Sequence, residues 1–543
     1  MKNSIIIILF IIFPFSLLKS QVHQDWVANY NGPLGSEDKA FSVAVDEAGN
    51  VYVTGQSYGG TTGTSWDAAT VKYNSNGIEQ WSKRYAGTSS DIGKVIAVDA
   101  SGNVYVAASS GQGANYSDYL TIKYNTNGVE LWTSFYSGPT MYNDILQAMT
   151  IDAAGNVYVT GRSQGTTSPD DYLTVKYNTN GVQQWTARYN GPGDFVDIPY
   201  AIATSPDGSI YITGYSVGLA TNNCTTIKYN SAGAEQWVCR YNSASYGNSV
   251  AVDAAGNVYV CGEIGTLTSS TNDFVTIKYN SAGVQQWANT YSSTGSFTDQ
   301  AKFIKFDLLG NVIVTGNSYV AGQGQNFTTI KYNTAGVQQW ITRYNGPSNY
   351  HDYTMDMVLD TLNNIYVTGL SYTNGATNDV DFQTVKYNSE GIQQWGIRYD
   401  GPGHKYDSPF AMTIDRIGNI YVAGEADMTG TQSYDYTTIK YSQGITGVNI
   451  LSNEIPSKFS LSQNYPNPFN PNTNIEFALP EKSFVKLKVF DFLGREVSEL
   501  VNENLSAGIY RYNFNGINLA SGMYFYKLET EKFSETKKMI LVK

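Results

Sequence analysis

Tryptophan recurs along the chain at a nearly constant interval, and this interval constrains the fold more than any other feature. Eight of the nine tryptophans lie 50 to 55 residues apart: Trp26, Trp81, Trp132, Trp185, Trp237, Trp287, Trp340 and Trp395. Similar phrases surround each of them, such as Asp46-Glu-Ala-Gly-Asn-Val-Tyr-Val and Thr70-Val-Lys-Tyr-Asn in the first copy. One unit of supersecondary structure is therefore repeated eight times, which is typical of a solenoid, a propeller or another array.

Each repeat is expected to form four antiparallel strands. In the first copy, β-branched and alternating residues at 41–45 and 51–54 flank a turn, and a second strand pair flanks the turn Asn74-Ser-Asn-Gly77. Four strands per unit are typical of a propeller blade. A second hairpin that is symmetric about its turn places Lys72 opposite Glu79, Thr70 opposite Trp81 and Asp67 opposite Arg84.

The two ends of the repeat region are complementary. The Lys-Tyr strand occurs eight times, but no tryptophan strand follows Lys440-Tyr441, and the spare tryptophan strand contains Trp26. An open solenoid needs a cap at each end. We therefore expect an all-β fold: residues 21–442 form a closed β-propeller of eight four-stranded blades, with the N-terminal strand completing the last blade. The repeats at 24–442 resemble the SBBP-type β-propeller repeat of exported bacterial proteins, a family that is nominally seven-bladed, so the number eight comes from counting.

The N-terminus and the charge indicate export. Residues 1–20 have the pattern of a signal peptide, with Lys2, an apolar run at 5–18 and the small Ser20. A membrane anchor is the alternative, although this run is short for a span of about 20 residues. The net charge is −12, and residues from 455 onward contain 11 Lys/Arg against 9 Asp/Glu, so the acidity belongs to the repeats. Nucleic acid is not expected as a partner.

A second domain follows the repeats. Residues 443–458 are expected to be a polar linker, and residues 459–543 combine a proline-rich entry with alternating strands, which predicts a small immunoglobulin-like β-sandwich. The ordered motifs of this segment are Tyr465-Pro-Asn-Pro-Phe-Asn-Pro, Val489-Phe-Asp-Phe-Leu-Gly-Arg-Glu-Val, Ala507-Gly-Ile-Tyr, Ser521-Gly-Met-Tyr-Phe-Tyr-Lys and Lys537-Lys-Met-Ile-Leu-Val-Lys.

These motifs closely resemble the type A C-terminal sorting domain of the type IX secretion system. The resemblance implies a protein that is secreted or held on the outer-membrane surface of a Gram-negative bacterium. It also implies that a translocon and a sortase recognise residues 459–543, and that the processed protein is attached to surface lipopolysaccharide. A plain adhesion module of the same fold is the alternative.

Strand direction sorts the connections onto two faces, one with short uniform turns and one with long variable loops, where binding residues usually lie. On the variable face, an aspartate precedes the first turn by eight positions in seven repeats, and Ser245 replaces it in the fifth: Asp38, Asp91, Asp144, Asp197, Asp299, Asp352 and Asp407. A ring of these carboxylates would bind Ca²⁺ or glycan hydroxyls with help from nearby Tyr142, Phe195, Tyr246, Phe297, Tyr350 and Tyr406. The favoured alternative is structural, with each carboxylate accepting backbone N–H bonds.

Cysteines and histidines give few candidates for chemistry. Cys224 and Cys239 are equidistant from the turn at 230–233, so a cross-strand disulfide and two free thiols are both considered. His351 with Asp352, and His404 with Asp407, are the residues to test for acid/base chemistry, with ordinary surface histidines as the alternative. The sequence contains no zinc motif and no nucleophile elbow. We therefore expect no catalytic residues and no cofactor apart from Ca²⁺.

The favoured function is a binding scaffold for a glycan or an extracellular protein. The alternatives are a secreted polysaccharide-degrading hydrolase or lyase, and a structural component of a surface layer.

Overall fold

The computed structural model describes residues 22–543 apart from 60–64, 112–115, 140–141, 167, 220, 266–270, 294–296, 374–378, 432, 444–447, 453–455, 506 and 517–518. Within these residues all regular structure is β-strand, and no helix is long and apolar enough to cross a membrane. The predicted signal peptide, residues 1–20, lies outside the described residues. The chain divides into two compact units, of which one is Val22–Ser442 and the other contains Gln443–Lys543.

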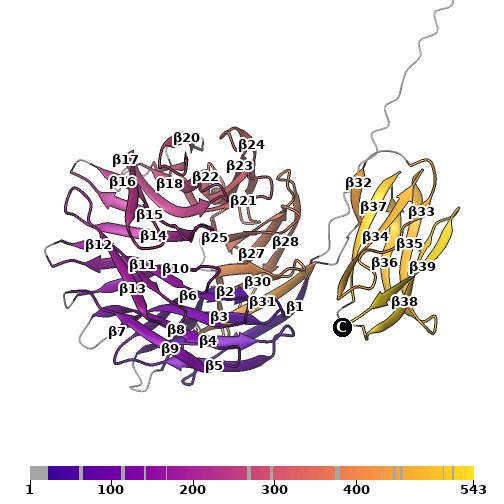
Figure 1. Ribbon diagram of the computed structural model, residues 1–543, viewed down its shortest axis with the longest axis horizontal. Coiled ribbons are helices and arrows are strands. Elements are labelled where there is room, and N and C mark those ends of the chain that lie inside the picture. The colour runs from indigo at the N-terminus through magenta and orange to yellow at the C-terminus, as the bar shows by residue number, and fades with distance from the viewer. Residues whose placement is uncertain are drawn as a thin grey trace, which may run out of the picture. The chain divides into compact units, whose positions relative to one another are not determined.

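The repeats of the first unit form antiparallel sheets whose strands follow one another in chain order (Figure 1). In the first sheet the order is β2 (Asp38–Val45), β3 (Val51–Tyr58), β4 (Trp66–Tyr73) and β5 (Glu79–Tyr85). The all-β class and the four-stranded antiparallel repeat are thereby confirmed. The sheets with the same pattern are β6 (Asp91–Val98), β7 (Val104–Gly111), β8 (Ser117–Tyr124) and β9 (Glu130–Tyr136); β10 (Asp144–Ile151), β11 (Val157–Gln164), β12 (Asp170–Tyr177) and β13 (Gln183–Tyr189); β21 (Gln300–Phe306), β22 (Val312–Val320), β23 (Gly324–Tyr332) and β24 (Gln338–Tyr344); and β25 (Asp352–Leu359), β26 (Ile365–Tyr372), β27 (Val380–Tyr387) and β28 (Gln393–Tyr399).

The fourth and fifth repeats differ from the expected pattern because they share a strand. Together they form one seven-stranded sheet, of β14 (Asp197–Thr204), β15 (Ile210–Val217), β16 (Asn222–Tyr229), β17 (Glu235–Val252), β18 (Val258–Ile264), β19 (Asp273–Tyr279) and β20 (Gln285–Tyr291). The 18-residue β17 is both the last strand of one repeat and the first strand of the next. Only 3 residues separate Tyr241 from Ser245, whereas 7 separate Tyr291 from Asp299 in the next repeat. The chain has no residues left for a loop here, so it stays extended.

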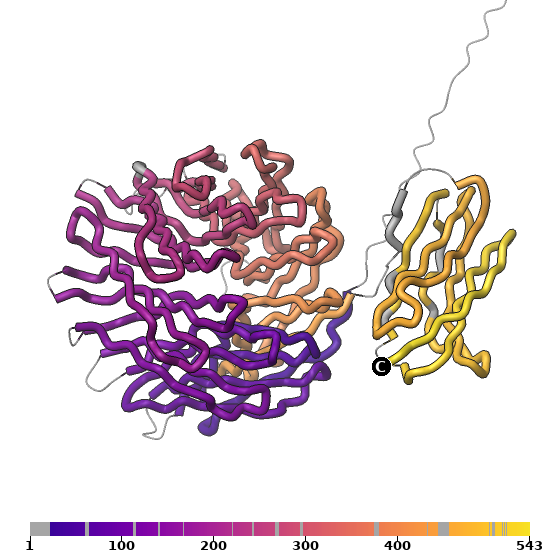
Figure 2. Tube along the Cα trace, in the orientation of Figure 1, coloured from indigo at the N-terminus to yellow at the C-terminus, as the bar shows by residue number. Residues whose placement is uncertain are grey.

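The first strand of the unit belongs to the sheet of the last repeat. The order in this sheet is β1 (Val22–Tyr30), β31 (Tyr434–Gln443), β30 (Ile420–Asp427) and β29 (Ser408–Ile414). Strand β2 in turn contacts β29 and β30, and Lys39 Nζ lies 3.1 Å from Glu425 Oε2. The indigo first repeat and the orange last repeat consequently lie side by side (Figure 2).

Burial follows the position of a strand within its sheet. The middle strands β3 and β4 are buried along almost their whole length, whereas most residues of the fourth strand, β5, are exposed or half-buried. Neighbouring sheets share hydrophobic clusters: Tyr52 and Ala68 of the first sheet pack with Ile96, Val104 and Leu120 of the second. Both faces of the middle strands are therefore covered, and polar residues such as Thr54, Asp67 and Thr70 are buried among the apolar ones.

The register of the second hairpin differs from the predicted one by two residues. Lys72 lies opposite Trp81, and Tyr73 lies opposite Glu79. Gly77 adopts a left-handed conformation (φ 77°) and Asn74 N–H donates to Ile78 O, which adds one residue to the turn. A bulge beside Lys72 adds a second residue.

The ion pairs that the sequence indicated nevertheless form across this hairpin. Diagonal neighbours remain within reach of long side chains. The pairs join Asp67 with Arg84 at 2.9 Å, Asp171 with Arg188 at 3.0 Å and Asp381 with Arg398 at 3.3 Å.

The C-terminal unit contains two four-stranded antiparallel sheets. One has the order β32 (Val448–Ser452), β37 (Gly508–Asn515), β34 (Asn472–Leu479) and β33 (Ser460–Leu461), and the other β36 (Glu496–Leu505), β35 (Ser483–Asp491), β38 (Gly522–Glu529) and β39 (Ser534–Leu541). Side chains of both sheets, including Phe477, Leu487 and Tyr526, form one hydrophobic core. Strand β32 falls within the segment 443–458 that the sequence suggested as a linker, and it pairs with β37.

Candidate functional site

The connections of the repeat unit lie on two faces, which we call the turn face and the loop face. The turn face carries the tight turns between the first and second strands and between the third and fourth strands of each repeat. The loop face carries the connections between the second and third strands, and those from each repeat to the next. The predicted aspartates and aromatic residues all belong to the loop face.

The seven predicted aspartates lie at or just before the start of a first strand and are almost fully buried, with exposed fractions of 0 to 2%. Each carboxylate accepts a hydrogen bond of 2.5 or 2.6 Å from a backbone N–H in the preceding connection. The donors are Gly32, Gly87, Gly138, Gly191, Ser293, Gly346 and Gly401. In the fifth repeat Ser245 Oγ instead accepts from Cys224 N–H at 2.9 Å.

Burial also changes the acidity of these groups. It raises the pKa of Asp38, Asp91, Asp144 and Asp197, against the hydrogen bonds that lower it, and it raises the pKa values of Asp352 and Asp407 to about 6. This geometry is that of the structural alternative, in which the carboxylate fixes the chain as it enters the sheet. It does not present a ring of exposed carboxylates to a ligand.

The predicted aromatic residues differ in exposure, but most have an aromatic partner. Tyr142 is 52% exposed, Phe195 48% and Phe297 40%, Tyr350 and Tyr406 are half-buried, and Tyr246 is buried. The ring pairs on this face are Tyr142 with Tyr116, Tyr246 with Tyr215, Phe297 with Tyr319, Tyr350 with Tyr372, and Tyr406 with Tyr434.

The partner rings come from the adjoining ends of second and third strands, and the sequence analysis missed them. Their signal in the sequence is a tyrosine beside the loop between those strands. The loop face therefore carries aromatic pairs in several successive repeats.

The two histidines occupy different environments. His351 is half-buried, its Nδ1 accepts from Gln325 N–H at 3.1 Å, and burial lowers its pKa. His404 is exposed, its Nδ1 lies 2.8 Å from Asp400 Oδ2, and the hydrogen bond to that carboxylate raises its pKa. A general base for acid/base catalysis must lie within reach of a substrate proton, and only His404 is both exposed and paired with a carboxylate.

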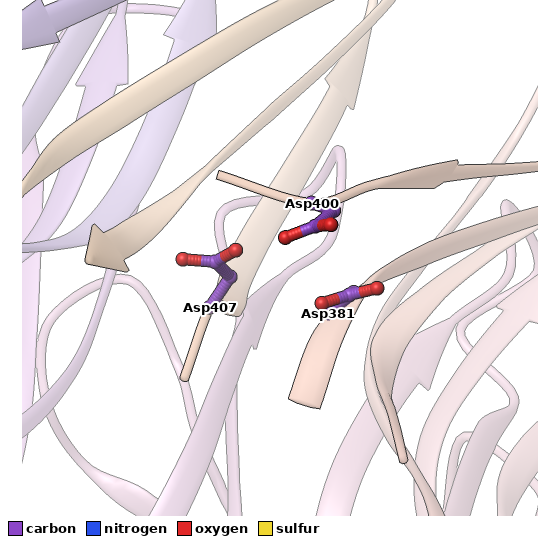
Figure 3. Close-up of side chains that lie close together, drawn as sticks. All are labelled: Asp381, Asp400 and Asp407. Carbon is purple, nitrogen blue, oxygen red and sulfur yellow. The ribbon is translucent and has the colours of Figure 1, made fainter. Parts of the chain in front are cut away.

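One carboxylate cluster stands out on the loop face. Asp381, Asp400 and Asp407 each offer an oxygen within 4.8 Å of the others, and Figure 3 shows the three side chains gathered about a common space. No other such group of three acidic, histidine or cysteine side chains occurs among the residues that the structure describes.

Burial and neighbouring charge perturb this cluster. Burial raises the pKa of Asp381 to about 7; Arg398 opposes the shift, and the charges of Asp400 and Asp407 add to it. Asp400 makes the cluster unusual, because four other repeats have asparagine at the equivalent position, namely Asn31, Asn190, Asn242 and Asn345. Oxygen ligands of this kind suit Ca²⁺, although Arg398 already neutralises one of the three charges.

Of the two alternatives for Cys224 and Cys239, the structure has the free thiols. All three cysteines are free, Cys239 lies opposite Thr226, and Cys224 lies opposite Tyr241. The same two-residue shift that moves Lys72 opposite Trp81 separates the two thiols. Cys239 Sγ donates instead to Gly283 O of the next repeat, at 2.9 Å.

Comparison with known families identifies both parts of the chain. The model of a secretion system C-terminal sorting domain matches residues 463–543, and that of a β-propeller repeat, SBBP, matches residues 32–60 and 80–113. The chain therefore carries SBBP repeats and a type IX sorting domain. It is an exported protein of a Gram-negative bacterium, located at the cell surface or secreted.

Individual relatives are distant. An uncharacterized WD repeat-containing protein of Acanthamoeba polyphaga mimivirus is 26% identical over 266 residues, which are 41% of this chain and only 19% of that protein. Among solved structures, PorZ, a surface component of the type IX secretion system of Porphyromonas gingivalis, is 12% identical with a TM-score of 0.33, over 93% of this chain and 81% of PorZ. A PL25 ulvan lyase is 11% identical with a TM-score of 0.39, over 72% of this chain and 95% of the lyase.

Proposed function

We propose that this exported protein is a closed, eight-bladed β-propeller that acts as a binding scaffold, with the loop face as its binding surface. The observation that carries the proposal is the set of aromatic pairs on that face, most of them exposed or half-buried, which the antiparallel sheets of successive repeats hold in place. Aromatic side chains bury much surface at little entropic cost and combine apolar faces with polar edges, so they are enriched at binding surfaces. The ligand we propose is a glycan or an extracellular protein.

Contacts between the first and last repeats support closure of the ring. Trp26 of β1 donates from Nε1 to Ser75 O at 3.1 Å, and its ring packs against Gly77. Trp185 makes the same contacts between two consecutive repeats, with Ser231 O at 3.1 Å and the ring against Gly233. The contacts between the first and last repeats thus have the same geometry as the contacts between two consecutive repeats. This is expected of a closed ring and not of an array with two free ends.

The organisation we propose for export follows the sequence. Residues 1–20 are a signal peptide, 21–442 the propeller, 443–458 the linker and 459–543 the sorting domain. A translocon reads the sorting domain, a sortase removes it, and the propeller is attached to surface lipopolysaccharide.

We place the proposed Ca²⁺ site at the Asp381, Asp400 and Asp407 cluster, because each of these carboxylates offers an oxygen within 4.8 Å of the other two. Calorimetric titration of the purified protein with CaCl₂ tests this site. The expected result is saturable heat and a higher melting temperature that are lost in Asp400→Asn. No heat in the unsubstituted protein removes Ca²⁺ from the proposal.

A glycan array followed by product analysis tests the binding function. We expect binding without turnover, and weaker binding when Tyr142 or Phe195 is replaced by alanine. As a control, Ile78→Ala changes an equally exposed side chain on the turn face and should leave binding unchanged. New reducing or unsaturated sugar ends would favour the polysaccharide-degrading alternative. Absence of any glycan or extracellular protein ligand would favour the surface-layer alternative.

A further inference from the structure

The hydroxyl of the tyrosine in the second strand of a repeat is normally satisfied by a carboxylate of the same repeat. In six repeats the second-strand tyrosine donates its hydroxyl hydrogen to the aspartate that starts the first turn, at 2.8 to 3.4 Å. The lysine of the third strand lies over the same tyrosine ring; for Lys72 and Tyr52 the distance from Nζ to the ring centroid is 5.2 Å. The sixth repeat has Ile313 in place of the tyrosine, and its turn carboxylate, Asp307, pairs with Lys331 at 2.8 Å.

The fourth repeat keeps the tyrosine and the lysine but lacks the carboxylate. Ser205 occupies the position of the turn aspartate, and the hydroxyl of the fully buried Tyr211 has no hydrogen-bond partner. Lys228 lies over the Tyr211 ring at 5.3 Å, and the contact of its ammonium group with Ser281 O is long, at 3.5 Å. A buried hydroxyl without a partner lowers the free energy of unfolding by roughly 1 to 3 kcal/mol. Serine in place of aspartate at position 205 therefore does not stabilise the fold.

A cavity of about 510 Å³ is found where this carboxylate is missing. It lies between the fourth and fifth repeats, and its lining includes Ser205, Asp207, Tyr211, Lys228, Gly256 and Ser281. A volume of this size falls in the range of small-molecule sites, which is about 300 to 1,000 Å³. The unpaired hydroxyl and the lysine therefore belong to a space that a molecule of monosaccharide or amino-acid size can occupy.

The one carboxylate in this lining is held by its own turn. Asp207 accepts hydrogen bonds from Ser205 Oγ and from Ser209 N–H. These hydrogen bonds are the main cause of its lowered pKa, to which the charge of Lys228 adds a smaller part. Asp207 thus does not take over the contact with Tyr211 that the turn aspartate makes elsewhere.

We infer that this cavity is a binding site for the carboxylate group of a small ligand, such as a uronic acid or an amino acid. The ligand carboxylate takes the place of the missing aspartate, accepts a hydrogen bond from Tyr211 and receives a charge-assisted one from Lys228. Such bonds are about twice as strong as those between neutral groups. The site lies on the turn face, so it is independent of the binding surface proposed on the loop face.

Calorimetric titration of the full mature chain tests the inference. The probes are sodium acetate, sodium galacturonate and sodium glutamate, at constant ionic strength with NaCl as the blank. We expect saturable binding with one site per chain. Tighter binding of galacturonate than of glutamate identifies a sugar acid, the reverse order identifies an amino acid, and equal binding of all three shows recognition of the carboxylate alone.

Ser205→Asp is the decisive variant, because it restores the aspartate that the other repeats carry at this position. It should supply the carboxylate from within the chain and abolish binding of all three probes. Tyr211→Phe and Lys228→Met should each weaken binding about tenfold, and all three variants should bind at the loop face as before. The inference is overturned if the unsubstituted chain binds none of the probes, or if Ser205→Asp binds them equally well.

Discussion

Replacing Trp26 by alanine tests whether the ring is closed, because this side chain connects the first strand of the unit to the sheet of the first repeat. Its indole lies 6.3 Å from the Tyr73 ring and 6.1 Å from the Tyr421 ring, and donates to Ser75 O. Removing a buried tryptophan costs about 3 to 5 kcal/mol. Since Trp26 is only half-buried, we expect a loss of about 3 kcal/mol.

The matched control is Trp185→Ala within the interior of the repeats. Trp185 is also half-buried, and its ring lies 6.0 Å from Tyr158 and 6.4 Å from Tyr229. The unfolding entropy is about 2.1 cal/mol/K per residue. For the unit Val22–Ser442, a loss of about 3 kcal/mol therefore lowers the melting temperature by about 3 °C.

Differential scanning calorimetry of the two variants side by side gives the comparison. A closed ring predicts equal decreases for Trp26→Ala and Trp185→Ala. Deletion of residues 21–33, which also removes the buried Ala28 and Tyr30, should lower the melting temperature by about 10 °C or more. An open array predicts no loss for Trp26→Ala and an unchanged melt for the deletion, and either result refutes the reasoning.

Three further predictions follow from the carboxylate cluster, the C-terminal domain and the cysteines. The folded-state pKa values of Asp381 (about 7) and Asp407 (about 6) lie above the unfolded value, so the folded chain holds more protons and its unfolding free energy falls as the pH rises from 5 to 8. Urea unfolding at both pH values should show that Asp400→Asn reduces this fall by roughly 0.5 to 1 kcal/mol, and equal falls would contradict the charge coupling. Removing residues 459–543 should trap the propeller in the periplasm, and fractionation that finds it displayed normally would contradict the assignment. Thiol titration under denaturing, non-reducing conditions should find three free cysteines, whereas a single free thiol would mean that Cys224 and Cys239 are bonded.

The repeat architecture was readable from the sequence because each strand carries a periodic signal and each turn carries Gly or Asn. The register was not, because two extra residues enter each hairpin without changing this pattern. Gly77 supplies the first by its left-handed conformation, and the bulge beside Lys72 supplies the second. The continuous strand β17 could not be predicted either. A short connection between two repeats can form a tight turn or an extended strand, and which of the two forms depends on whether the strands on both sides remain paired.

The candidate site was predicted less well than the fold, since the sequence cannot distinguish a buried carboxylate from an exposed one. Asp38 and Asp407 occupy equivalent positions and are both fully buried, yet among the described residues only Asp407 belongs to a group of three carboxylates, with Asp381 and Asp400. That difference arises between two elements, the end of β28 and the start of β29. It becomes visible only when the chain is folded.

Departures from the repeat are informative because the other repeats show what the scaffold requires at each position. Some departures are compensated locally. Ile313 removes a hydroxyl, and Asp307 turns to Lys331; Ser245 removes a carboxylate, and its Oγ still accepts a backbone N–H.

Two departures are not fully compensated. Ser205 leaves the Tyr211 hydroxyl without a partner, and Asp400, although paired with the exposed His404, adds charge beside two carboxylates whose pKa values are already raised. The residues that other repeats carry at these positions, aspartate in place of Ser205 and asparagine in place of Asp400, would avoid the unpaired hydroxyl and the added charge. Folding alone therefore does not account for Ser205 and Asp400. An external partner explains them better: an anion bound at Tyr211 and a cation bound at Asp400.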